Sequence, residues 1–257
     1  MTVPNLFDLS GKVAIVTGGG NGIGKACCEM LAAAGAAVAV SDLKPEDAQA
    51  VADAINAGGG KAIALGCNVT ADDDLVKLVE TTVKELGGIH ILVNNAGGGG
   101  GGRENPFKIT VDQFAFVFKL NVFSAWRLSQ LCVPHMKKDG YGSIINITSM
   151  SSINKSPNMS AYAASKAAMN HMTCNLAHDF GPEVRINAVG PGATKTAALA
   201  SVLTPEIEKA MLSHTPIKRL GEASDIAGAV LYFAAPVSEW VSGQVMFVNG
   251  GGVQTLD

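Results

Sequence analysis

Charged residues are scarce in this chain: they make up 16% of its 257 residues, and the formal net charge is −3. No block of lysine and arginine stands out, as it would in a protein that binds nucleic acid or an anionic membrane surface. No apolar run is long enough to cross a bilayer, and the N-terminus lacks the basic and apolar regions of a secretory signal. The sequence therefore predicts a soluble cytoplasmic protein that binds neither nucleic acid nor membrane.

Cysteine is also rare, and its spacing excludes the usual disulfide frameworks. The five cysteines are odd in number, and no two of them form a Cys-x-x-Cys pair. Most lie within apolar periodic segments, so we expect reduced residues of the core. They are Cys27, Cys28, Cys67, Cys132 and Cys174.

Aromatic residues are few, at 5%, whereas hydrophobic residues reach 47% and glycine occurs 30 times. This composition suits a compact α/β enzyme that acts on small molecules, and the length suits one domain. We expect a single domain over residues 1–257, with a cofactor part at about 10–150 and a catalytic and substrate part at about 145–257.

Short apolar runs alternate with helical patterns along the chain, and seven of them read as strands. The alternation predicts a doubly wound parallel sheet with right-handed crossovers and helices on both faces. One long helix is expected at 110–137, broken late by Pro134, and Ser160 is expected to N-cap the helix that runs to Phe180. The other predicted helices are 25–34, 45–57, 72–86 and 223–234, and the strands are 12–16, 36–40, 62–67, 89–93, 143–147, 184–189 and 244–248.

A glycine-rich loop separates the first predicted strand from the first helix. Glycine lets the backbone turn sharply and lets a pyrophosphate approach the N–H groups at the helix start. Alone such a loop is weak evidence, but a strand before it and a helix after it favour a dinucleotide site. The candidate ligands here are Gly18, Asn21, Gly22, Ile23 and Gly24.

Asp42 ends the second predicted strand, about 20 residues after the glycine loop, where a ribose diol is expected. A carboxylate accepts hydrogen bonds from two hydroxyls and repels a 2′-phosphate, and neither Asn21 nor Leu43 offers a compensating positive charge. The sequence therefore predicts NAD rather than NADP. The alternative is that Asp42 is only a turn residue before Pro45.

Two more strand ends carry candidate cofactor residues. Asn68 and Val69 follow the third strand and are expected beside the adenine. The fourth strand runs into Asn95-Ala96-Gly97 and five further glycines, which allow either close contact with a ligand or slack in a loop. Asn121 lies in an apolar stretch of the long helix and needs partners: it either braces the backbone or holds a water beside Lys166.

Tyr162 and Lys166 are the main catalytic candidates, because residues four apart on a helix share one face. A phenol is a poor acid or base at neutral pH unless a neighbouring ammonium favours its ionised form, and Lys166 can supply that charge. Ser149, upstream at a strand end, could hydrogen-bond the oxygen that Tyr162 protonates or deprotonates. Alone, Tyr-x-x-x-Lys would be a solvated helix face, but Gly18, Asp42, Asn95, Ser149 and Gly192 all follow strand ends and should meet in one crevice.

Together, the motifs Thr17-Gly18-x-x-x-Gly22-x-Gly24, Asn94-Asn95-Ala96-Gly97, Ser149, Tyr162-x-x-x-Lys166 and Pro191-Gly192 resemble the short-chain dehydrogenase/reductase family over nearly the whole chain. The resemblance implies a Rossmann-type fold, a nicotinamide cofactor, no metal, a homotetramer, and a catalytic tetrad. In it Tyr162 would be the acid/base, Lys166 would bind the nicotinamide ribose and lower the tyrosine pKa, Ser149 would hold the substrate oxygen and Asn121 would support the proton relay. Further cofactor residues expected are Pro191, Gly192, Thr194 and Thr196.

More closely, segments such as Leu120-Asn121-Val122-Phe123-Ser124 and Trp240-Val241-Ser242-Gly243-Gln244 resemble bacterial 7-alpha-hydroxysteroid dehydrogenases. The resemblance implies that Gly99 and Asn154, with Ser149 and Tyr162, face a hydroxysteroid. Residues 194–215 have an apolar face and are interpreted as a lid over the substrate, although a plain packing helix fits too. Lys195 lies in this segment and either meets a substrate carboxylate or points to water.

The competing functions are a 3-oxoacyl-thioester reductase, a sugar or polyol dehydrogenase, and a dinucleotide-sensing binding protein. Asp42 argues against the 3-oxoacyl-thioester reductase, because the biosynthetic reductases of the short-chain dehydrogenase/reductase family usually take NADPH. The complete tetrad argues against the last, since a sensor does not need it.

Overall fold

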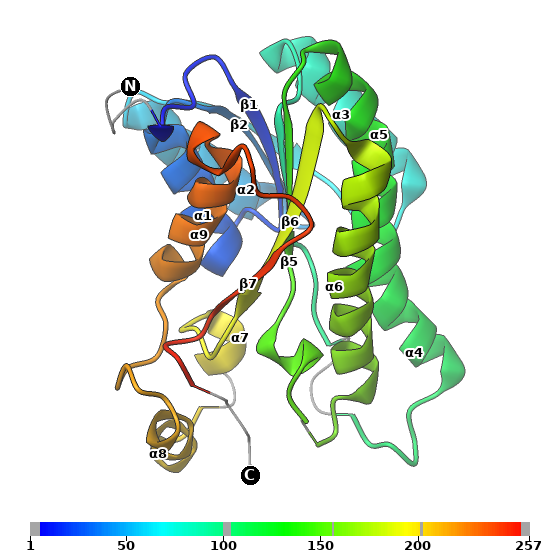
Figure 1. Cartoon of the computed structure of the whole chain (residues 1–257), viewed down its shortest axis with the longest axis vertical. Helices are drawn as coiled ribbons and strands as arrows, with labels where there is room; N and C mark the ends of the chain where they lie inside the picture. Colours follow the sequence, from blue (N-terminus) through cyan, green and yellow to red (C-terminus); the bar gives the residue numbers. More distant parts are fainter. Residues whose placement is uncertain (1–5, 100–103, 156, 201–202, 253–257) are drawn as a thin grey trace.

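The structure is a computed structural model that describes residues 6–99, 104–155, 157–200 and 203–252. A parallel sheet of seven strands forms its centre, in the order β3-β2-β1-β4-β5-β6-β7 (Figure 1). This is the predicted Rossmann-type doubly wound sheet. The strands are β1 Val13–Thr17, β2 Ala37–Asp42, β3 Lys61–Gly66, β4 Ile91–Asn94, β5 Gly142–Ile147, β6 Val184–Pro191 and β7 Val245–Val248.

Helices cover both faces of the sheet, and each layer encloses its own hydrophobic cluster. α1, α2 and α9 pack on one face, and α3, α5 and α6 on the other (Figure 1). The α-helices are α1 Gly22–Ala33, α2 Pro45–Ala57, α3 Asp72–Leu86, α4 Val111–Phe118, α5 Ser124–Lys138, α6 Ser160–Phe180, α7 Ala197–Ala200, α8 Pro205–Ser213 and α9 Ala223–Ala234. Short turns of other helix types lie at Lys119–Phe123, Met150–Ser152 and Pro236–Ser238.

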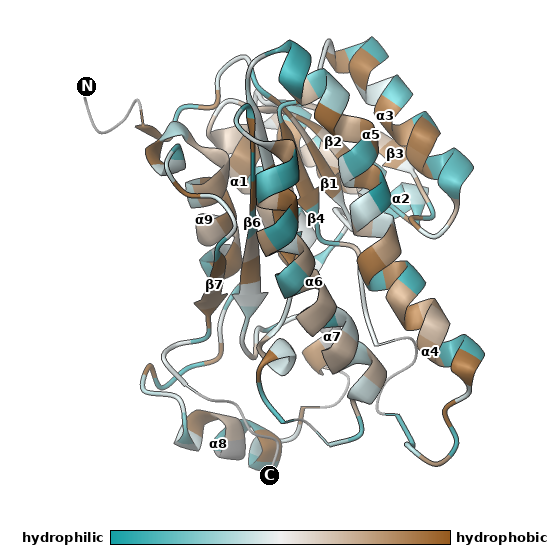
Figure 2. Cartoon of the chain, turned by 45° about the vertical axis from the view of Figure 1, so that its right-hand side comes forward, coloured by the Kyte–Doolittle hydropathy of each residue, from teal (hydrophilic) through white to brown (hydrophobic). Residues whose placement is uncertain are grey.

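The central strands are apolar without alternation because both of their faces are covered. Every residue of β1, β5 and β6 is buried. In Figure 2 the hydrophobic colour follows β6 and β7, whereas the helices show mixed colours. The sequence therefore presents the sheet as continuous apolar runs and the helices as amphipathic segments.

The long helix predicted at 110–137 is not one α-helix. It divides into α4 and α5 around a π-helical turn, Lys119–Phe123, that carries the buried Asn121. Pro134 lies inside α5 and does not break it, so the predicted late break is wrong. The interruption falls instead where the Asn121 side chain leaves the helix to bind another segment.

Ser160 is the first residue of α6, and Met159 occupies the N-cap position, so the predicted serine cap is also wrong. The predicted lid contains α7 and α8, beyond the carboxyl ends of the strands (Figure 1). Residues 100–102 of the glycine run and residues 201–202 of the lid lie outside the described residues. Within the described part of the chain, no helix is both long enough and apolar enough to span a membrane.

Candidate active site

The glycine loop after β1 leads into α1 with its helix N-terminus open. Asn21 stands at the N-cap position but makes no side-chain capping hydrogen bond, and the first turn contains no acidic residue. The backbone N–H groups at the start of α1 are thus available to an anion, which the helix dipole also favours.

Two glycines of this loop stand where a side chain would collide with neighbouring protein atoms. A Cβ on Gly24 would lie 2.0 Å from the carbonyl oxygen of Gly18, and a Cβ on Gly18 would lie 2.9 Å from Asn95 Nδ2. Asn95 Nδ2 donates to the carbonyls of Thr17 at 2.9 Å and Gly18 at 3.0 Å. The Asn95 side chain therefore holds the glycine loop against the end of β4.

Asp42, the last residue of β2, points its carboxylate at the same loop. Its Oδ2 accepts from the N–H of Gly20 at 2.9 Å, and its Oδ1 accepts from the N–H of Lys44 at 3.2 Å. A Cβ on Gly20 would lie 2.6 Å from Asp47 Cβ and 2.9 Å from Asp42 Oδ2, so this position too favours glycine. Asp42 thus shapes the loop besides presenting the carboxylate expected to bind a ribose.

Asn121 connects the loop after β4 with the helix that carries Tyr162. Its Oδ1 accepts from the N–H of Gly98 at 2.9 Å, and its Nδ2 donates to the carbonyl of Gly98 at 3.0 Å and to Ser165 Oγ at 2.8 Å. Ser165 Oγ in turn donates to the carbonyl of Tyr162 at 2.7 Å. The Asn121 side chain thus braces the backbone, and its other expected role, holding a water beside Lys166, remains a prediction.

Ser149, Tyr162 and Lys166 meet between the end of β5 and the start of α6. The Ser149 side chain lies close enough to Tyr162 to lower the pKa of its phenol, and Lys166 Nζ lies 5.8 Å from the centroid of the Tyr162 ring. Lys166 Nζ donates to the carbonyl of Ile147 at 2.8 Å, and Thr148 Oγ1 donates to the carbonyl of Lys166 at 3.0 Å. These bonds tie α6 to the strand end that carries Ser149.

Burial sets the protonation of this pair. It lowers the pKa of the Lys166 ammonium to about 8. It also raises the pKa of the Tyr162 phenol, and the Ser149 side chain opposes that shift without cancelling it. The lowered tyrosine pKa expected from Lys166 is therefore not seen in this structure, where desolvation of the phenolate is the largest influence on the pKa of Tyr162.

The loop after β4 and the base of the predicted lid also reach this crevice. A Cβ on Gly97 would lie 2.7 Å from Asn121 Oδ1 and 3.2 Å from Lys166 Nζ. A Cβ on Gly22 would lie 3.5 Å from Thr196 Cγ2. The structure thus brings the glycine loop, the loop after β4, the lid base and the catalytic candidates to one edge of the sheet.

The remaining candidates lie along the same edge and differ in their hydrogen bonding and exposure. Asn68 Oδ1 accepts from both the N–H and the hydroxyl of Thr70, at 3.0 and 2.8 Å. Leu43 is 70% exposed. The roles of these two residues at the cofactor remain predictions, as do those of Ile23, Val69, Ala96, Gly99, Asn154, Pro191, Gly192 and Thr194.

Lys195 does not extend alone into a pocket. Its Nζ lies 2.7 Å from Glu222 Oε1, and about half of each side chain is exposed. Its backbone N–H donates to the carbonyl of Gly221 at 2.8 Å. The lysine is thus held at the base of α9 by an ion pair.

Three residues of the site were assigned no role from the sequence, although Thr17 stands in the glycine motif. Thr17 Oγ1 accepts from the N–H groups of Asn95 at 3.1 Å and Ala96 at 3.0 Å. Ser165 links Asn121 to Tyr162, and its place between Tyr162 and Lys166 could have indicated a role. The third, Glu104, contacts the start of α6, and no local pattern marks it.

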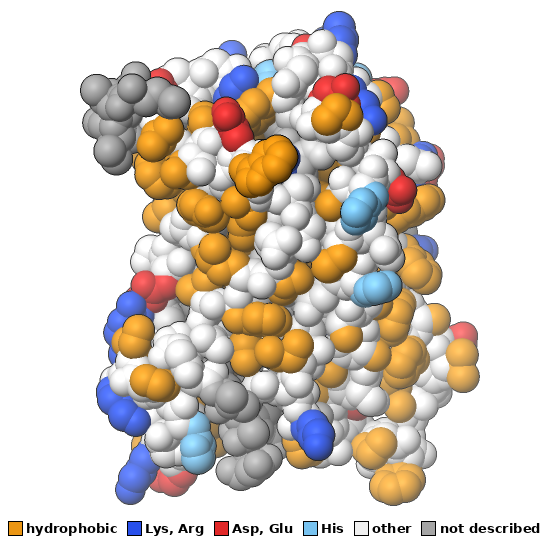
Figure 3. Space-filling model, in the orientation of Figure 1, with side chains coloured by type: hydrophobic (Ala, Val, Ile, Leu, Met, Phe, Trp, Pro, Cys, Tyr) orange, Lys and Arg blue, Asp and Glu red, His pale blue; other side chains and the backbone are white. Residues whose placement is uncertain are grey.

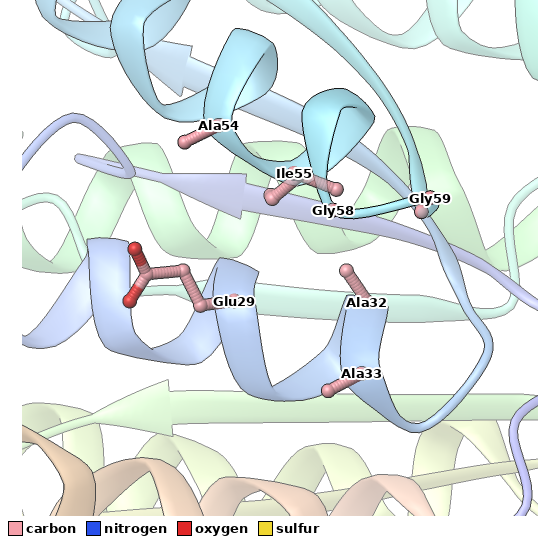
Figure 4. A pocket seen from close by; sticks show the side chains of 8 residues that line it. Glu29, Ala32, Ala33, Ala54, Ile55, Gly58 and Gly59 are labelled. Carbon is pink, nitrogen blue, oxygen red and sulfur yellow. The ribbon is translucent and has the colours of Figure 1, made fainter.

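A surface hollow between the C-terminal ends of α1 and α2 lies at the opposite edge of the sheet (Figure 4). Its lining is Glu29, Ala32, Ala33, Ala54, Ile55, Gly58, Gly59 and Gly60. Glu29 is its single charged side chain and lies 3.8 Å from Lys25 Nζ. The lining contains none of the catalytic or cofactor candidates.

Known proteins are similar to this chain in sequence and in fold. The family model described as enoyl-(acyl carrier protein) reductase matches residues 18–252. The chain is 49% identical over 250 residues to the 7alpha-hydroxysteroid dehydrogenase of Escherichia coli, covering 97% of each chain. It is 37% identical to a 4-formylbenzenesulfonate dehydrogenase of Comamonas testosteroni, over 95% of this chain and 99% of the relative.

Among solved structures, a 7 alpha-hydroxysteroid dehydrogenase complexed with NADH and 7-oxo glycochenodeoxycholic acid matches with a TM-score of 0.96 and 48% identity over the full length of both chains. A short-chain type dehydrogenase/reductase from Mycobacterium marinum matches with a TM-score of 0.90 and 32% identity, over 97% of this chain and 98% of the other.

Proposed function

The chain belongs to the short-chain dehydrogenase/reductase family, and on that premise we propose that it interconverts the 7α-hydroxyl of a hydroxysteroid, such as a bile acid, with the ketone, using NAD. One observation carries the proposal: Ser149, Tyr162 and Lys166 meet beside the glycine-rich strand ends. The near full-length similarity to enzymes of this substrate class supports the choice of steroid.

In the proposed reaction Tyr162 exchanges a proton with the substrate oxygen. The cofactor, when bound, would accept the hydride of the carbinol carbon in the oxidised form and return it to the ketone in the reduced form. Ser149 hydrogen-bonds the substrate oxygen and orients it toward the Tyr162 hydroxyl. Because burial raises the pKa of Tyr162, the phenol is protonated at neutral pH and ready to donate in the direction of ketone reduction. Lys166 offers its ammonium to the phenolate formed by that donation.

The residues present fit a dinucleotide. The uncapped start of α1 suits the pyrophosphate, and the Asp42 carboxylate suits a ribose diol while repelling a 2′-phosphate. A side chain at Gly18, Gly24 or Gly97 would collide with protein atoms, so the backbone stays bare along this edge. The proposed NAD ligands are Gly18, Asn21, Gly22, Ile23, Gly24, Asp42, Leu43, Asn68, Val69, Asn95, Ala96, Gly97, Tyr162, Lys166, Pro191, Gly192, Thr194 and Thr196.

A steroid would contact Ser149 and Tyr162 at its reacting hydroxyl and α7–α8 over its apolar body. A rigid apolar ligand gains affinity from burial and needs few polar contacts for orientation. Asn154 and Gly99 are the proposed further contacts.

The deciding experiment is an assay of the purified protein with a panel of 7α-hydroxysteroids, 3-oxoacyl thioesters, enoyl thioesters and polyols, each with NAD and with NADP. We expect turnover of 7α-hydroxysteroids with NAD and little turnover of their 7β epimers. Preference for an acyl thioester or a polyol would overturn the substrate, and binding of NAD without turnover of any alcohol would indicate a sensor.

We also propose a homotetramer in the cytoplasm. Large aromatic side chains on and between α4 and α5 support the assembly, since Phe116, Phe123 and Trp126 are 47%, 55% and 45% exposed. On the face of Figure 3, charged side chains lie mostly toward the rim, and on the edge strand β7 Met246 is 36% exposed. Light scattering of the purified protein measures the assembly, and a monomeric mass would contradict it.

A further inference from the structure

A carboxylate from a distant loop caps the helix that carries Tyr162. Glu104 Oε1 accepts from the N–H groups of Ala161 at 2.9 Å and Tyr162 at 3.1 Å. Its Oε2 accepts from the N–H of Ala161 at 3.0 Å and from Ser160 Oγ at 2.6 Å. One side chain thus receives the backbone donors of the first turn of α6.

The helix has no cap of its own. The first N–H groups of any α-helix lack partners within the helix, and Met159 at the N-cap position has no side-chain group that satisfies them. A carboxylate at this end also complements the positive end of the helix dipole. A carboxylate at this position therefore both accepts hydrogen bonds from the N–H groups of the first turn and complements the helix dipole.

A second contact fixes the same joint through the backbone. The N–H of Glu104 donates to the carbonyl of Asn158 at 2.7 Å. Asn158 has a φ of 59°, in the left-handed region that asparagine adopts more readily than most residues with a side chain. The segment that carries Glu104 thus holds the turn that leads into α6.

Glu104 is ionised in this environment. Burial acts to raise its pKa, but the hydrogen bonds from Ser160, Ala161 and Tyr162 outweigh burial, and the pKa lies below its usual value. The cap is therefore a charged acceptor at neutral pH.

Loss of the Glu104 cap should displace Tyr162 more than Lys166. Tyr162 lies in the capped first turn, whereas Lys166 lies one turn further and is anchored to β5 through the carbonyl of Ile147. Ser149 belongs to a different segment, so fraying of the first turn would move the phenol relative to Ser149 while leaving Lys166 in place.

We propose that Glu104 is a positioning residue for the oxidoreductase reaction, which holds the first turn of α6 so that the Tyr162 hydroxyl faces Ser149 and the substrate oxygen. The inference rests on the proposed function only in taking Tyr162 as the acid/base. It adds a residue from outside the catalytic motifs.

The test compares Glu104→Ala and Glu104→Gln with a control, Asp112→Ala. Asp112 is an exposed acid in the first turn of α4, so its removal takes away one negative charge without touching α6. Since small misplacements of reacting groups cost up to about 100-fold in rate, we expect kcat of Glu104→Ala to fall about 10- to 100-fold. NAD affinity should stay near that of wild type, because the glycine loop and Asp42 are unchanged.

Two further readouts separate positioning from simple stabilisation. Hydrogen exchange at the amides of Ala161 and Tyr162 should speed up in Glu104→Ala, and Glu104→Gln, which keeps one acceptor oxygen, should recover part of both kcat and protection. All assays are made well below the unfolding transition of each variant. If Glu104→Ala does not fold, the isosteric Glu104→Gln decides by the same measurements.

Faster amide exchange with unchanged kcat would overturn the proposal by showing a cap that serves stability alone. A loss of kcat equal to that of Asp112→Ala, or without faster exchange, would also overturn it. Failure of the proposed function is distinguishable, because it would show as wild-type inactivity toward 7α-hydroxysteroids. The Glu104 effect is a ratio of variant to wild type on whichever alcohol or ketone the wild type converts.

Discussion

Asn121 and Gly98 form a pair of hydrogen bonds, at 2.9 Å to the glycine N–H and 3.0 Å to its carbonyl. The π-helical turn that carries Asn121 interrupts the α4–α5 helix, and the side chain uses the interruption to bind the loop after β4. Through Ser165 the same amide reaches the backbone of Tyr162. One side chain therefore positions both the loop after β4, which carries candidate cofactor residues, and the helix that carries Tyr162.

Removing this amide should impair both stability and turnover. Asn121→Ala removes the hydrogen bonds to partly buried Gly98 and to buried Ser165, and each buried polar group left unpaired costs about 1–3 kcal/mol. Asn56 provides a matched control, since it makes the same double hydrogen bond to the backbone of Ala62, at 2.8 and 3.0 Å, between α2 and β3. We expect both variants to lose unfolding free energy, Asn121→Ala more because Asn121 is fully buried whereas Asn56 is exposed, but only Asn121→Ala to lose kcat. An equal effect on kcat would contradict a specific role of Asn121.

Tyr162→Phe should lose nearly all turnover and still bind NAD, because only the titrating hydroxyl is removed. General acid/base catalysis contributes about 10²–10⁴-fold to the rate. Tyr141→Phe is the control, since that hydroxyl donates to the carbonyl of Ala234 away from the site. NAD binding is measured by fluorescence titration and turnover by absorbance of NADH. Near-normal turnover of Tyr162→Phe would rule out its assignment.

Cofactor preference should depend on Asp42 in two separable ways. Asp42→Ala removes both the negative charge and the acceptor of the Gly20 N–H. It should therefore weaken the binding of NAD and reduce the preference for NAD over NADP. Asp42→Asn keeps an acceptor oxygen and should narrow the preference with a smaller loss of NAD affinity. The measurement is kcat/KM with each cofactor. A wild type that already prefers NADP would refute the assignment of Asp42.

The sheet and the crevice followed from the sequence because both depend on local patterns. Apolar runs closed by glycine or a polar residue indicate strand ends, and parallel strands bring those ends to one edge. Asp42 was expected at such an end, and it is the last residue of β2.

The contacts that hold the crevice depend on chain paths that local patterns do not reveal. Ser160 was a good local choice for a cap, yet the structure caps α6 with Glu104 from a distant segment. Proline suggested a break at Pro134, whereas the helix is interrupted at Asn121 by a tertiary hydrogen bond. The pKa of Tyr162 depends on how deeply the fold buries it, which the spacing to Lys166 does not reveal.

Lys166 should lower stability at neutral pH while serving catalysis. Burial lowers its pKa to about 8 from an ordinary 10.5. Below pH 8 the folded chain holds a buried ammonium, and between the two values only the unfolded chain binds the proton, so the stability contribution of Lys166 rises with pH. Lys166→Met carries no proton, so any stability advantage over wild type should shrink between pH 7 and about pH 9.5. Urea unfolding at both pH values measures this.

The control for that experiment is Lys84→Met, at a lysine whose side chain is 82% exposed. It reports the effect of losing one surface charge at each pH. A difference between Lys166→Met and wild type that stays constant or grows with pH would contradict a buried, weakly basic ammonium. Lys166→Met should also lose turnover, since no ammonium then stands beside Tyr162.

Lys195 should not affect the preference for a charged over an uncharged substrate, because its ammonium is already paired with Glu222. It lies 2.7 Å from Glu222, at the base of α9, and both side chains are half exposed. If the substrate is a bile acid, the ratio of kcat/KM for cholate over its uncharged methyl ester should be the same in wild type and Lys195→Met. Glu222→Gln releases the ammonium from its partner, and a higher ratio in that variant alone would place Lys195 within reach of the carboxylate. A ratio that falls toward equality in Lys195→Met would show that the lysine binds the carboxylate in the native enzyme, against the pairing seen here.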